Sequence, residues 1–174
     1  SRLYLTLFLG LRLNVDFERF MPERFSWVLP QKLAVGSFPN ATTSVSKLRR
    51  EGITAVLSLT ENHERLVPAD VSHSFLWEQV PIPDGFKGGI PTEEQFAQTL
   101  QILDRWYRKG HVVYVHCLAG VGRSASVCCL YVAQRHSLTL PEAIALVKAQ
   151  HEYAAPDPNQ VAVMQRVVAS LLTE

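Results

Sequence analysis

The sequence predicts an α/β domain in which a central, mainly parallel sheet is flanked by helices. Short apolar runs rich in β-branched residues alternate with longer stretches whose apolar residues recur at helical spacing. Residues 53–59, with the sequence ITAVLSL, are apolar on both faces, as a parallel strand covered by helices requires. Loops at residues 60–64, 81–91 and 117–122 follow strands, and therefore fall at the carboxyl edge of the sheet, where α/β domains hold their sites.

The first half of the chain predicts an opening strand pair, one helix and two further strands. A turn between two apolar segments indicates a hairpin. A hydroxyl residue at one of positions 42–44 can cap a short helix, and Gly52 ends it. We therefore expect a strand pair within residues 26–37, a helix over residues 42–50, and strands at residues 53–59 and 74–80.

The second half predicts a strand among four helices. Thr92 and Gln95 have the spacing of a capping box, and Gly110 ends the helix that follows them. Pro141 fits the first turn of a later helix. We expect a strand at residues 111–115 and helices at residues 92–109, 122–136, 142–150 and 159–172.

The chain divides into an N-terminal extension, residues 1–24, and a domain, residues 25–174. Residues 3–11 are apolar but are bracketed by Arg2 and Arg12, and they are shorter than the roughly 20 residues of a membrane span. We expect no transmembrane span. Packing of this segment on the domain is the favoured interpretation, and a truncated signal or anchor is the alternative.

Composition and charge exclude several classes of protein. The 174 residues include 17 basic and 16 acidic ones, so no global field favours nucleic acid or an anionic membrane. Cysteine occurs only at positions 117, 128 and 129, an odd count that makes a poor disulfide framework and no zinc motif. We expect a cytoplasmic protein, because reduced thiols fit a reducing compartment, and a monomer.

Residues 113–124, VYVHCLAGVGRS, carry the prediction of function. An apolar strand ends in His116 and Cys117, five residues with two glycines follow, and Arg123 opens a helix. Backbone N–H groups of such a loop and helix start can converge on an anion of phosphate size. Arginine adds a bidentate fork that lysine lacks. The residues expected to surround the phosphoryl group are Leu118, Ala119, Gly120, Val121, Gly122 and Arg123.

This combination implies a cysteine-dependent phosphatase. The helix N-terminus and Arg123 favour a thiolate at Cys117, which would attack phosphorus and form a phosphocysteine that water hydrolyses. Ser124 can donate a hydrogen bond to the departing thiolate, and we expect His116 to orient the loop rather than transfer protons. Because arginine and backbone groups carry the phosphate charge, we expect no metal and no other cofactor.

The pattern His-Cys-x5-Arg-Ser resembles the protein tyrosine phosphatase superfamily, and its surroundings resemble the small atypical dual-specificity phosphatases. Three further segments are similar to that branch: SWVLP at residues 26–30, SLTE at residues 58–61 and IPD at residues 82–84. The resemblance covers the chain from about Phe25 onward. It implies the α/β fold of that family and the hydrolysis of phosphomonoesters, with a phosphorylated protein or peptide as partner.

The resemblance also implies further site residues. In the family, an aspartate about 30 positions before the cysteine is the general acid, and Asp84 stands there in a proline- and glycine-rich loop. Asp84 is also the only acidic residue within that loop. Asn159, with Gln165 beyond it, resembles the family's Pro-Asn…Gln pattern and would brace the cysteine loop. Asp157, which precedes a proline, is a weaker candidate for the acid.

Several alternatives stay open. A loop without lysine favours phosphoproteins, above all phosphotyrosine, over inositol lipids, while phosphoglucan phosphatases have similarly neutral loops. A non-catalytic phosphate reader and a sulfur- or arsenate-handling thiol enzyme are less favoured, because the cysteine, arginine, serine and acid are all present. Glu61 and Glu64 either line the rim of the site or are solvated loop charges. Cys128 and Cys129 are interpreted as small helix residues rather than redox partners.

Overall fold

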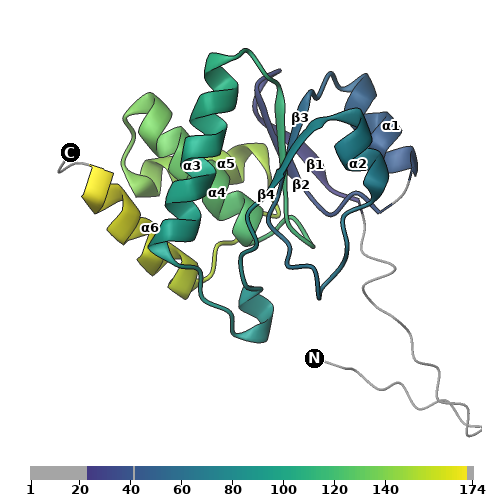
Figure 1. Ribbon diagram of the computed structural model, residues 1–174. Helices are drawn as coiled ribbons and strands as arrows, with labels where there is room; N and C mark the ends of the chain where they lie inside the picture. Colours follow the sequence, from purple (N-terminus) through teal and green to yellow (C-terminus); the bar gives the residue numbers. More distant parts are fainter. Residues whose placement is uncertain (1–22, 41, 172–174) are drawn as a thin grey trace, which may run out of the picture.

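The computed structural model describes residues 23–40 and 42–171, which form a five-stranded sheet between two layers of helices (Figure 1). The strand order is β1-β2-β5-β3-β4. The strands are β1 (Phe25–Leu29), β2 (Leu33–Gly36), β3 (Ala55–Ser58), β4 (Leu76–Gln79) and β5 (Val113–His116). Only the β1–β2 pair is antiparallel, so the predicted mainly parallel sheet is confirmed.

The register of the three central strands brings their carboxyl ends level. Gly36 of β2 and Ser58 of β3 both pair with His116 of β5. The residues that follow these strands therefore emerge side by side at one edge. Cys117, directly after β5, lies in the middle of that edge, where loops from both neighbouring strands can reach it.

Helices cover the two faces unequally. On one face lie α1 (Thr42–Arg50) and α2 (Ala69–Ser74), and on the other lie α3 (Glu93–Arg108), α4 (Arg123–His136), α5 (Leu140–Gln150) and α6 (Pro158–Leu171) (Figure 1). Eleven successive residues of α4, from its first turn to its third, are buried, and α4 packs against the sheet and the three helices beside it. The larger core therefore surrounds α4.

The elements match the sequence-based expectations with two differences. The capping box of Thr92 and Gln95 is present at the start of α3. Residues 69–74 form the helix α2, which was not expected, because Val71 is its only buried residue and it offers no apolar periodicity. The strand expected from residue 74 accordingly begins at Leu76.

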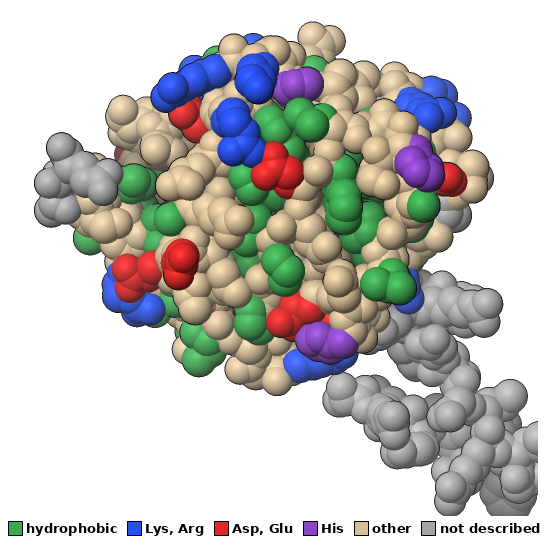
Figure 2. All heavy atoms as spheres, in the orientation of Figure 1, with side chains coloured by type: hydrophobic (Ala, Val, Ile, Leu, Met, Phe, Trp, Pro, Cys, Tyr) green, Lys and Arg blue, Asp and Glu red, His purple; other side chains and the backbone are tan. Residues whose placement is uncertain are grey.

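The segment expected to be an N-terminal extension lies almost wholly outside the described residues. Arg24, at its end, packs on the domain: its N–H donates to Ser37 Oγ at 2.8 Å, and its guanidinium donates to the Ala119 carbonyl at 2.8 Å. Across residues 23–40 and 42–171, no helix is both long and apolar enough to span a bilayer. Acidic and basic side chains are both spread over the visible face (Figure 2), in keeping with the balanced charge.

Replacing Trp106 by Ala should lower the free energy of unfolding by about 3–5 kcal/mol, because the side chain is fully buried between α3 and the rest of the core. Urea denaturation measures the loss. Leu66→Ala is the control, since Leu66 is exposed and its truncation should change stability by less than about 0.5 kcal/mol. Equal effects from the two variants would contradict the assignment of Trp106 to the core.

Candidate active site

The loop between β5 and α4 is held from outside by its carbonyl groups. Each backbone carbonyl of residues 118–122 accepts a hydrogen bond from beyond the loop. The Phe38 N–H donates to carbonyl 118, Arg24 Nη1 to carbonyl 119 and His151 Nε2 to carbonyl 120. The Ala155 N–H donates to carbonyl 121, and both the N–H and the hydroxyl of Ser126 donate to carbonyl 122, all at 2.7–3.0 Å. Because a trans peptide group points its N–H opposite to its C=O, the N–H groups of residues 119–123 face inward. This is the arrangement of an anion-binding nest.

Gly120 allows the loop to turn at its tightest point. Its φ of +74° lies in the left-handed region, and a Cβ there would come within 2.6–2.8 Å of the backbone of Gly36 and Ser37. Both the backbone angle and the close approach to β2 therefore exclude a side chain. The loop then enters α4, whose N-cap is Gly122, so the first N–H groups of α4 add to the inward-facing set.

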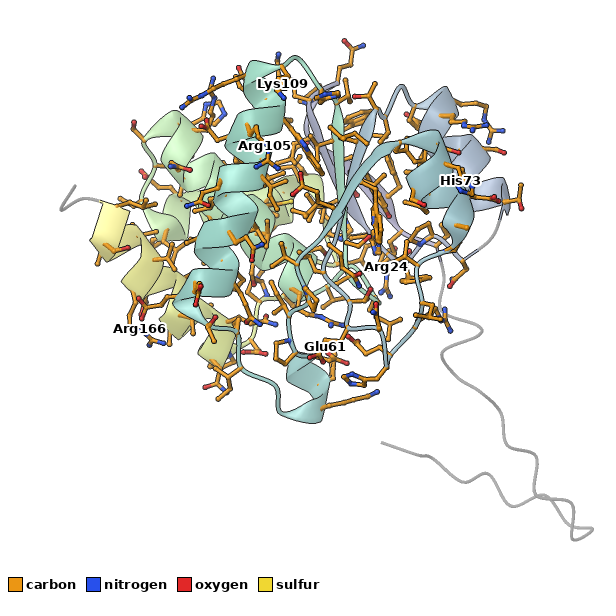
Figure 3. All side chains as sticks on the ribbon, in the orientation of Figure 1. Arg24, Glu61, His73, Arg105, Lys109 and Arg166 are labelled. Carbon is orange, nitrogen blue, oxygen red and sulfur yellow. The ribbon has the colours of Figure 1, made fainter. Side chains whose placement is uncertain are left out.

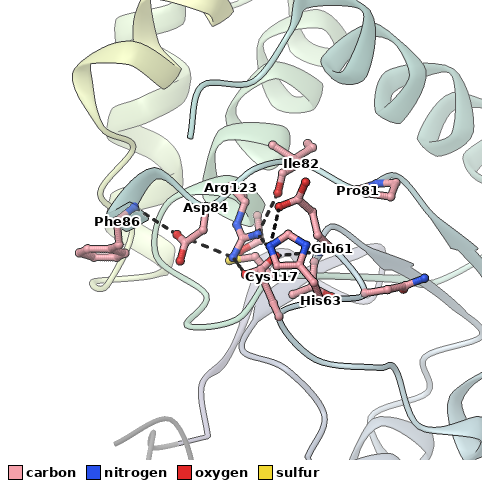
Figure 4. Close-up of polar contacts among 12 residues, drawn as sticks. Glu61, His63, Pro81, Ile82, Asp84, Phe86, Cys117 and Arg123 are labelled. Atoms are coloured by element: carbon pink, nitrogen blue, oxygen red, sulfur yellow. Dashed lines mark hydrogen bonds and ion pairs between the residues drawn. The ribbon is translucent and has the colours of Figure 1, made fainter. Parts of the chain in front are cut away.

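The fold brings together Cys117, Arg123 and Asp84 (Figure 4), and Ser124 lies beside Cys117. Cys117 is buried, and its Sγ lies 3.2 Å from Ser124 Oγ. Asp84 Oδ1 lies 3.8 Å from Arg123 Nη2 and accepts the Phe86 N–H at 3.2 Å. The acid candidate comes from the loop after β4, whose short helical turn η2 (Gly85–Lys87) begins directly after it.

Glu64 holds the guanidinium of Arg123 from the side. Its two carboxylate oxygens accept from Arg123 Nη1 and Nη2 at 2.7 and 2.8 Å, and Nη1 also donates to the Ile82 carbonyl at 2.9 Å. Both side chains are almost completely buried, with 3% of the Arg123 side chain and 1% of the Glu64 side chain exposed. Burial alone would raise the pKa of Glu64, but the bonds from Arg123 and from the Glu61 N–H outweigh it and lower the pKa. The pair fixes the position of the Arg123 guanidinium beside the loop, with both of its terminal nitrogens bonded to Glu64.

Glu64 settles one alternative that the sequence left open. It lines the site rather than being solvated, whereas Glu61 is partly exposed and pairs with His63 at 3.5 Å. The sequence feature that indicated a place for Glu64 in the site was its position in the loop after β3, at the edge where the strands end. Glu61 and η2 lie at the same end of the domain, opposite to Lys109 at the far end of α3 (Figures 1 and 3).

His116 orients the loop from below through a chain of hydrogen bonds. Trp77 Nε1 donates to Ser58 Oγ at 2.9 Å, Ser58 Oγ donates to His116 Nε2 at 2.6 Å, and His116 Nδ1 donates to the Cys117 carbonyl at 3.0 Å. Burial, together with the charge of Arg123, lowers the pKa of His116 to about 4. The imidazole is therefore neutral at physiological pH, and its contact with Cys117 is to the backbone.

His151 supports the loop from the outer side, which the sequence did not reveal. The side chain is buried, its Nδ1 accepts from Ser26 Oγ at 2.8 Å, and its Nε2 donates to the Gly120 carbonyl at 2.7 Å. Burial and the nearby charge of Arg24 lower the pKa of His151. The neutral ring therefore has one donor and one acceptor, and both are used.

The structure corrects the expected role of Asn159. Asn159 and Gln165 are exposed, whereas the neighbouring Gln160 is buried with its amide against Gly122. Ser126 Oγ, whose hydrogen is directed to the Gly122 carbonyl, also lies 3.5 Å from Gln160 Oε1. The side chain of this segment that lies against the loop is therefore that of Gln160. The family pattern pointed to Asn159, one position before Gln160, and one position along a helix turns a side chain by about 100°.

The other two cysteines are components of the core. Cys128 and Cys129 are free and buried within α4. Burial raises the pKa of Cys129 to about 12 and raises that of Cys128 well above its ordinary value. Both are thus protonated thiols that fill small spaces, as the sequence suggested.

Comparisons with known proteins agree with this geometry. A family model described as "Dual specificity phosphatase, catalytic domain" matches residues 33–167. The chain is 29% identical over 106 residues to dual specificity protein phosphatase 1-A of Xenopus laevis, covering 61% of this chain and 27% of that protein. It is 29% identical over 125 residues to the phosphatidylglycerophosphate phosphatase PTPMT1 of Arabidopsis thaliana, covering 71% of this chain and 36% of that protein. The chain thus spans about a third of these relatives.

A solved structure extends the likeness to the whole domain. The crystal structure of Tk-PTP in its active form superposes with a TM-score of 0.72 at 25% identity. The match covers 82% of this chain and 95% of that one. The expected α/β phosphatase fold is therefore confirmed.

Replacing Glu64 by Gln should lower the free energy of unfolding by about 3 kcal/mol at neutral pH, because a buried guanidinium loses its counter-charge. The folded-state pKa of Glu64 lies below its ordinary value of 4.5, so the stabilisation by the carboxylate is complete above pH 4.5 and is lost as the pH falls through the folded-state pKa. Urea denaturation between neutral pH and about pH 3 should therefore show the difference between wild type and Glu64→Gln narrowing on acidification.

The control for this titration is Glu61→Gln, which removes a partly exposed carboxylate from the same loop. Its effect should be under about 1 kcal/mol. If the difference in unfolding free energy between the wild type and Glu64→Gln stayed constant with pH, the stabilising role of the ionised Glu64 carboxylate would be contradicted.

Proposed function

The chain belongs to the dual-specificity phosphatase family, and on this premise we propose that it hydrolyses phosphomonoesters of proteins through a phosphocysteine intermediate. The observation that carries the proposal is that Cys117 and the guanidinium of Arg123 lie together beside a loop whose five carbonyls are all bonded outward, which leaves its N–H groups to face an anion. Such a site binds a dianionic phosphoryl group and holds a sulfur nucleophile against it. This is the chemistry of an enzyme rather than of a passive reader.

The first step transfers the phosphoryl group to sulfur. The Cys117 thiolate attacks phosphorus in line, and the P–O bond to the leaving group breaks as the S–P bond forms. Negative charge on the phosphoryl oxygens is held by the loop N–H groups and by Arg123. Asp84, 3.8 Å from Arg123, protonates the leaving oxygen.

The second step returns the enzyme to its starting state. Asp84, now ionised, takes a proton from water, the water oxygen attacks phosphorus, and the S–P bond breaks. The departing sulfur is stabilised by Ser124, whose Oγ lies 3.2 Å away. Inorganic phosphate then leaves with both protonation states restored.

The surroundings favour an aryl phosphate. The loop residues at positions 118–122 carry no basic side chain, so they suit a single phosphoryl group. Phe86 follows Asp84 closely, points away from the loop and is 83% exposed, which offers an aromatic face to a phosphotyrosine ring (Figure 4). Leu66, in the loop between β3 and α2, and Ile90, in the loop after η2, are also exposed.

A phosphorylated lipid headgroup is the second candidate. Two plant relatives are named phosphatidylglycerophosphate phosphatases, PTPMT1 and PTPMT2. The neutral loop and a single phosphoryl site would also accept a terminal phosphate of this kind. We further propose a monomeric protein, and a cytoplasmic one, the latter supported by its three free buried thiols.

Cys117→Ser should abolish turnover of p-nitrophenyl phosphate, because the hydroxyl is not ionised by the same loop and helix start. The wild type should release phosphate from a phosphotyrosine peptide faster than from phosphothreonine, phosphatidylglycerophosphate or phosphoglucan. Release of phosphate measures both. Cys128→Ala, which alters a buried thiol within α4, is the control and should retain turnover. Full activity of Cys117→Ser would overturn the proposed mechanism. Faster phosphate release from phosphatidylglycerophosphate than from the phosphotyrosine peptide would make the lipid, rather than a phosphoprotein, the favoured substrate.

Asp84→Ala should lose about a hundredfold or more in kcat on phenyl phosphate, because its leaving group needs a proton, and less than about tenfold on 2,4-dinitrophenyl phosphate. Steady-state kinetics on a series of aryl phosphates gives the dependence on leaving-group pKa. Asp70→Ala, in α2, is the control carboxylate and should behave as wild type. Equal losses on both substrates would argue against an acid at this position.

A further inference from the structure

The acid loop rests on the first turn of α6. A Cβ added at Gly85, the residue after Asp84, would overlap the Asp157 carboxylate. It would also lie 3.2 Å from Gln160 Nε2. The backbone beside the acid therefore touches two side chains more than 70 positions further along the chain.

The same glutamine touches the phosphate loop. A Cβ at Gly122 would lie 3.0 Å from both Nε2 and Oε1 of Gln160. Gln160 is 2% exposed, so its amide fills the space between Gly122 and Gly85. One side chain thus separates the loop that holds phosphate from the loop that carries the acid.

The turn that makes these contacts is rigid. Asp157 Oδ1 accepts the Gln160 N–H at 2.8 Å, and Gln160 Oε1 accepts the Asp157 N–H at 2.9 Å. These reciprocal bonds form a capping box, and Pro158 occupies the first helical position. Asp157 therefore serves the helix start rather than replacing Asp84 as acid, and its second carboxylate oxygen faces Gly85.

We propose that Asp157 and Gln160 are positioning residues that seat the acid loop at a fixed distance from the phosphate loop. The inference rests on the proposed function, in which Asp84 protonates the leaving oxygen. Asp84 is bonded to its own loop through the Phe86 N–H, so its position follows that of the loop as a whole. Glycine at position 85 lets the loop come close to α6, and in this position the Asp84 carboxylate lies 3.8 Å from Arg123 Nη2.

The test uses the leaving-group dependence of kcat. Gly85→Ala inserts a methyl group between the acid loop and Asp157, so the loop must move away from the first turn of α6. We expect kcat on phenyl phosphate to fall by about tenfold or more, and kcat on 2,4-dinitrophenyl phosphate by less than about threefold, a weaker form of the effect of removing the acid. Damage to the phosphate loop would instead lower both rates alike.

A second substitution should restore the rate. Asp157→Ser keeps an N-cap oxygen for α6 but vacates the space beside Gly85. The Gly85→Ala/Asp157→Ser double variant should return to within about threefold of the wild-type kcat on phenyl phosphate. Gly88→Asn is the matched control in the same loop, since Gly88 has φ +79° with nothing within 4 Å of an added Cβ, and asparagine tolerates that conformation.

A third variant tests the spacer. Gln160→Ala removes the amide between the two loops, and we expect the same leaving-group-dependent loss without the added bulk at position 85. If Gly85→Ala does not fold, as judged by circular dichroism, Gln160→Ala decides the question alone. Losses that are equal across leaving groups, or a Gly85→Ala enzyme that Asp157→Ser does not rescue, would overturn the inference.

Failure of this inference is distinct from failure of the proposed function. Asp84→Ala is measured on the same substrates. If its loss is independent of the leaving group, the acid assignment itself is wrong. If Asp84→Ala shows the steep dependence while Gly85→Ala and Gln160→Ala match the wild type, Asp84 is the acid but α6 does not position it.

Discussion

The site depends on one constraint, which is that a planar peptide group cannot point its carbonyl and its N–H the same way. Five successive carbonyls after Cys117 are each bonded to a group outside the loop. Their N–H groups are consequently directed inward before any anion arrives. The enzyme does not need to reorganise its dipoles when charge develops on the phosphoryl oxygens, and such preorganised stabilisation is usually the largest contribution to catalysis.

The groups that hold these carbonyls come from across the chain. Arg24 is 95 positions from its acceptor, Ala119, and His151 is 31 positions from Gly120. The parallel register of β2, β3 and β5 makes this possible, because it brings the ends of these strands level. The sheet therefore acts less as a barrier between two cores than as the frame that places distant donors around one loop.

The difference between local features of the sequence and contacts made only in the folded chain explains which parts of the structure could be predicted. The fold and the cysteine loop could be predicted because strand periodicity, the glycines and the Cys-to-Arg spacing are local properties of the sequence, and the family resemblance pointed to Asp84, which the structure places 3.8 Å from Arg123. Glu64, 59 positions before Arg123, and His151 act through contacts that exist only once the strands are paired. The choice of Asn159 over Gln160 failed for a related reason, since only the direction in which α6 starts decides which of two adjacent polar residues faces inward.

The proposed nucleophile, Cys117, and the proposed acid, Asp84, are held in different ways. Cys117 lies in the core, where burial of α4 opposes any displacement. The start of the acid loop is anchored, because Ile82 lies in the core, but its tip buries little: Phe86 and Ile90 are exposed, so displacing the tip sacrifices little apolar contact. In the proposed arrangement the position of the loop tip is therefore set by close steric fit against the first turn of α6 rather than by hydrophobic burial. Steric fit of this kind specifies where Asp84 lies without adding apolar side chains to the core.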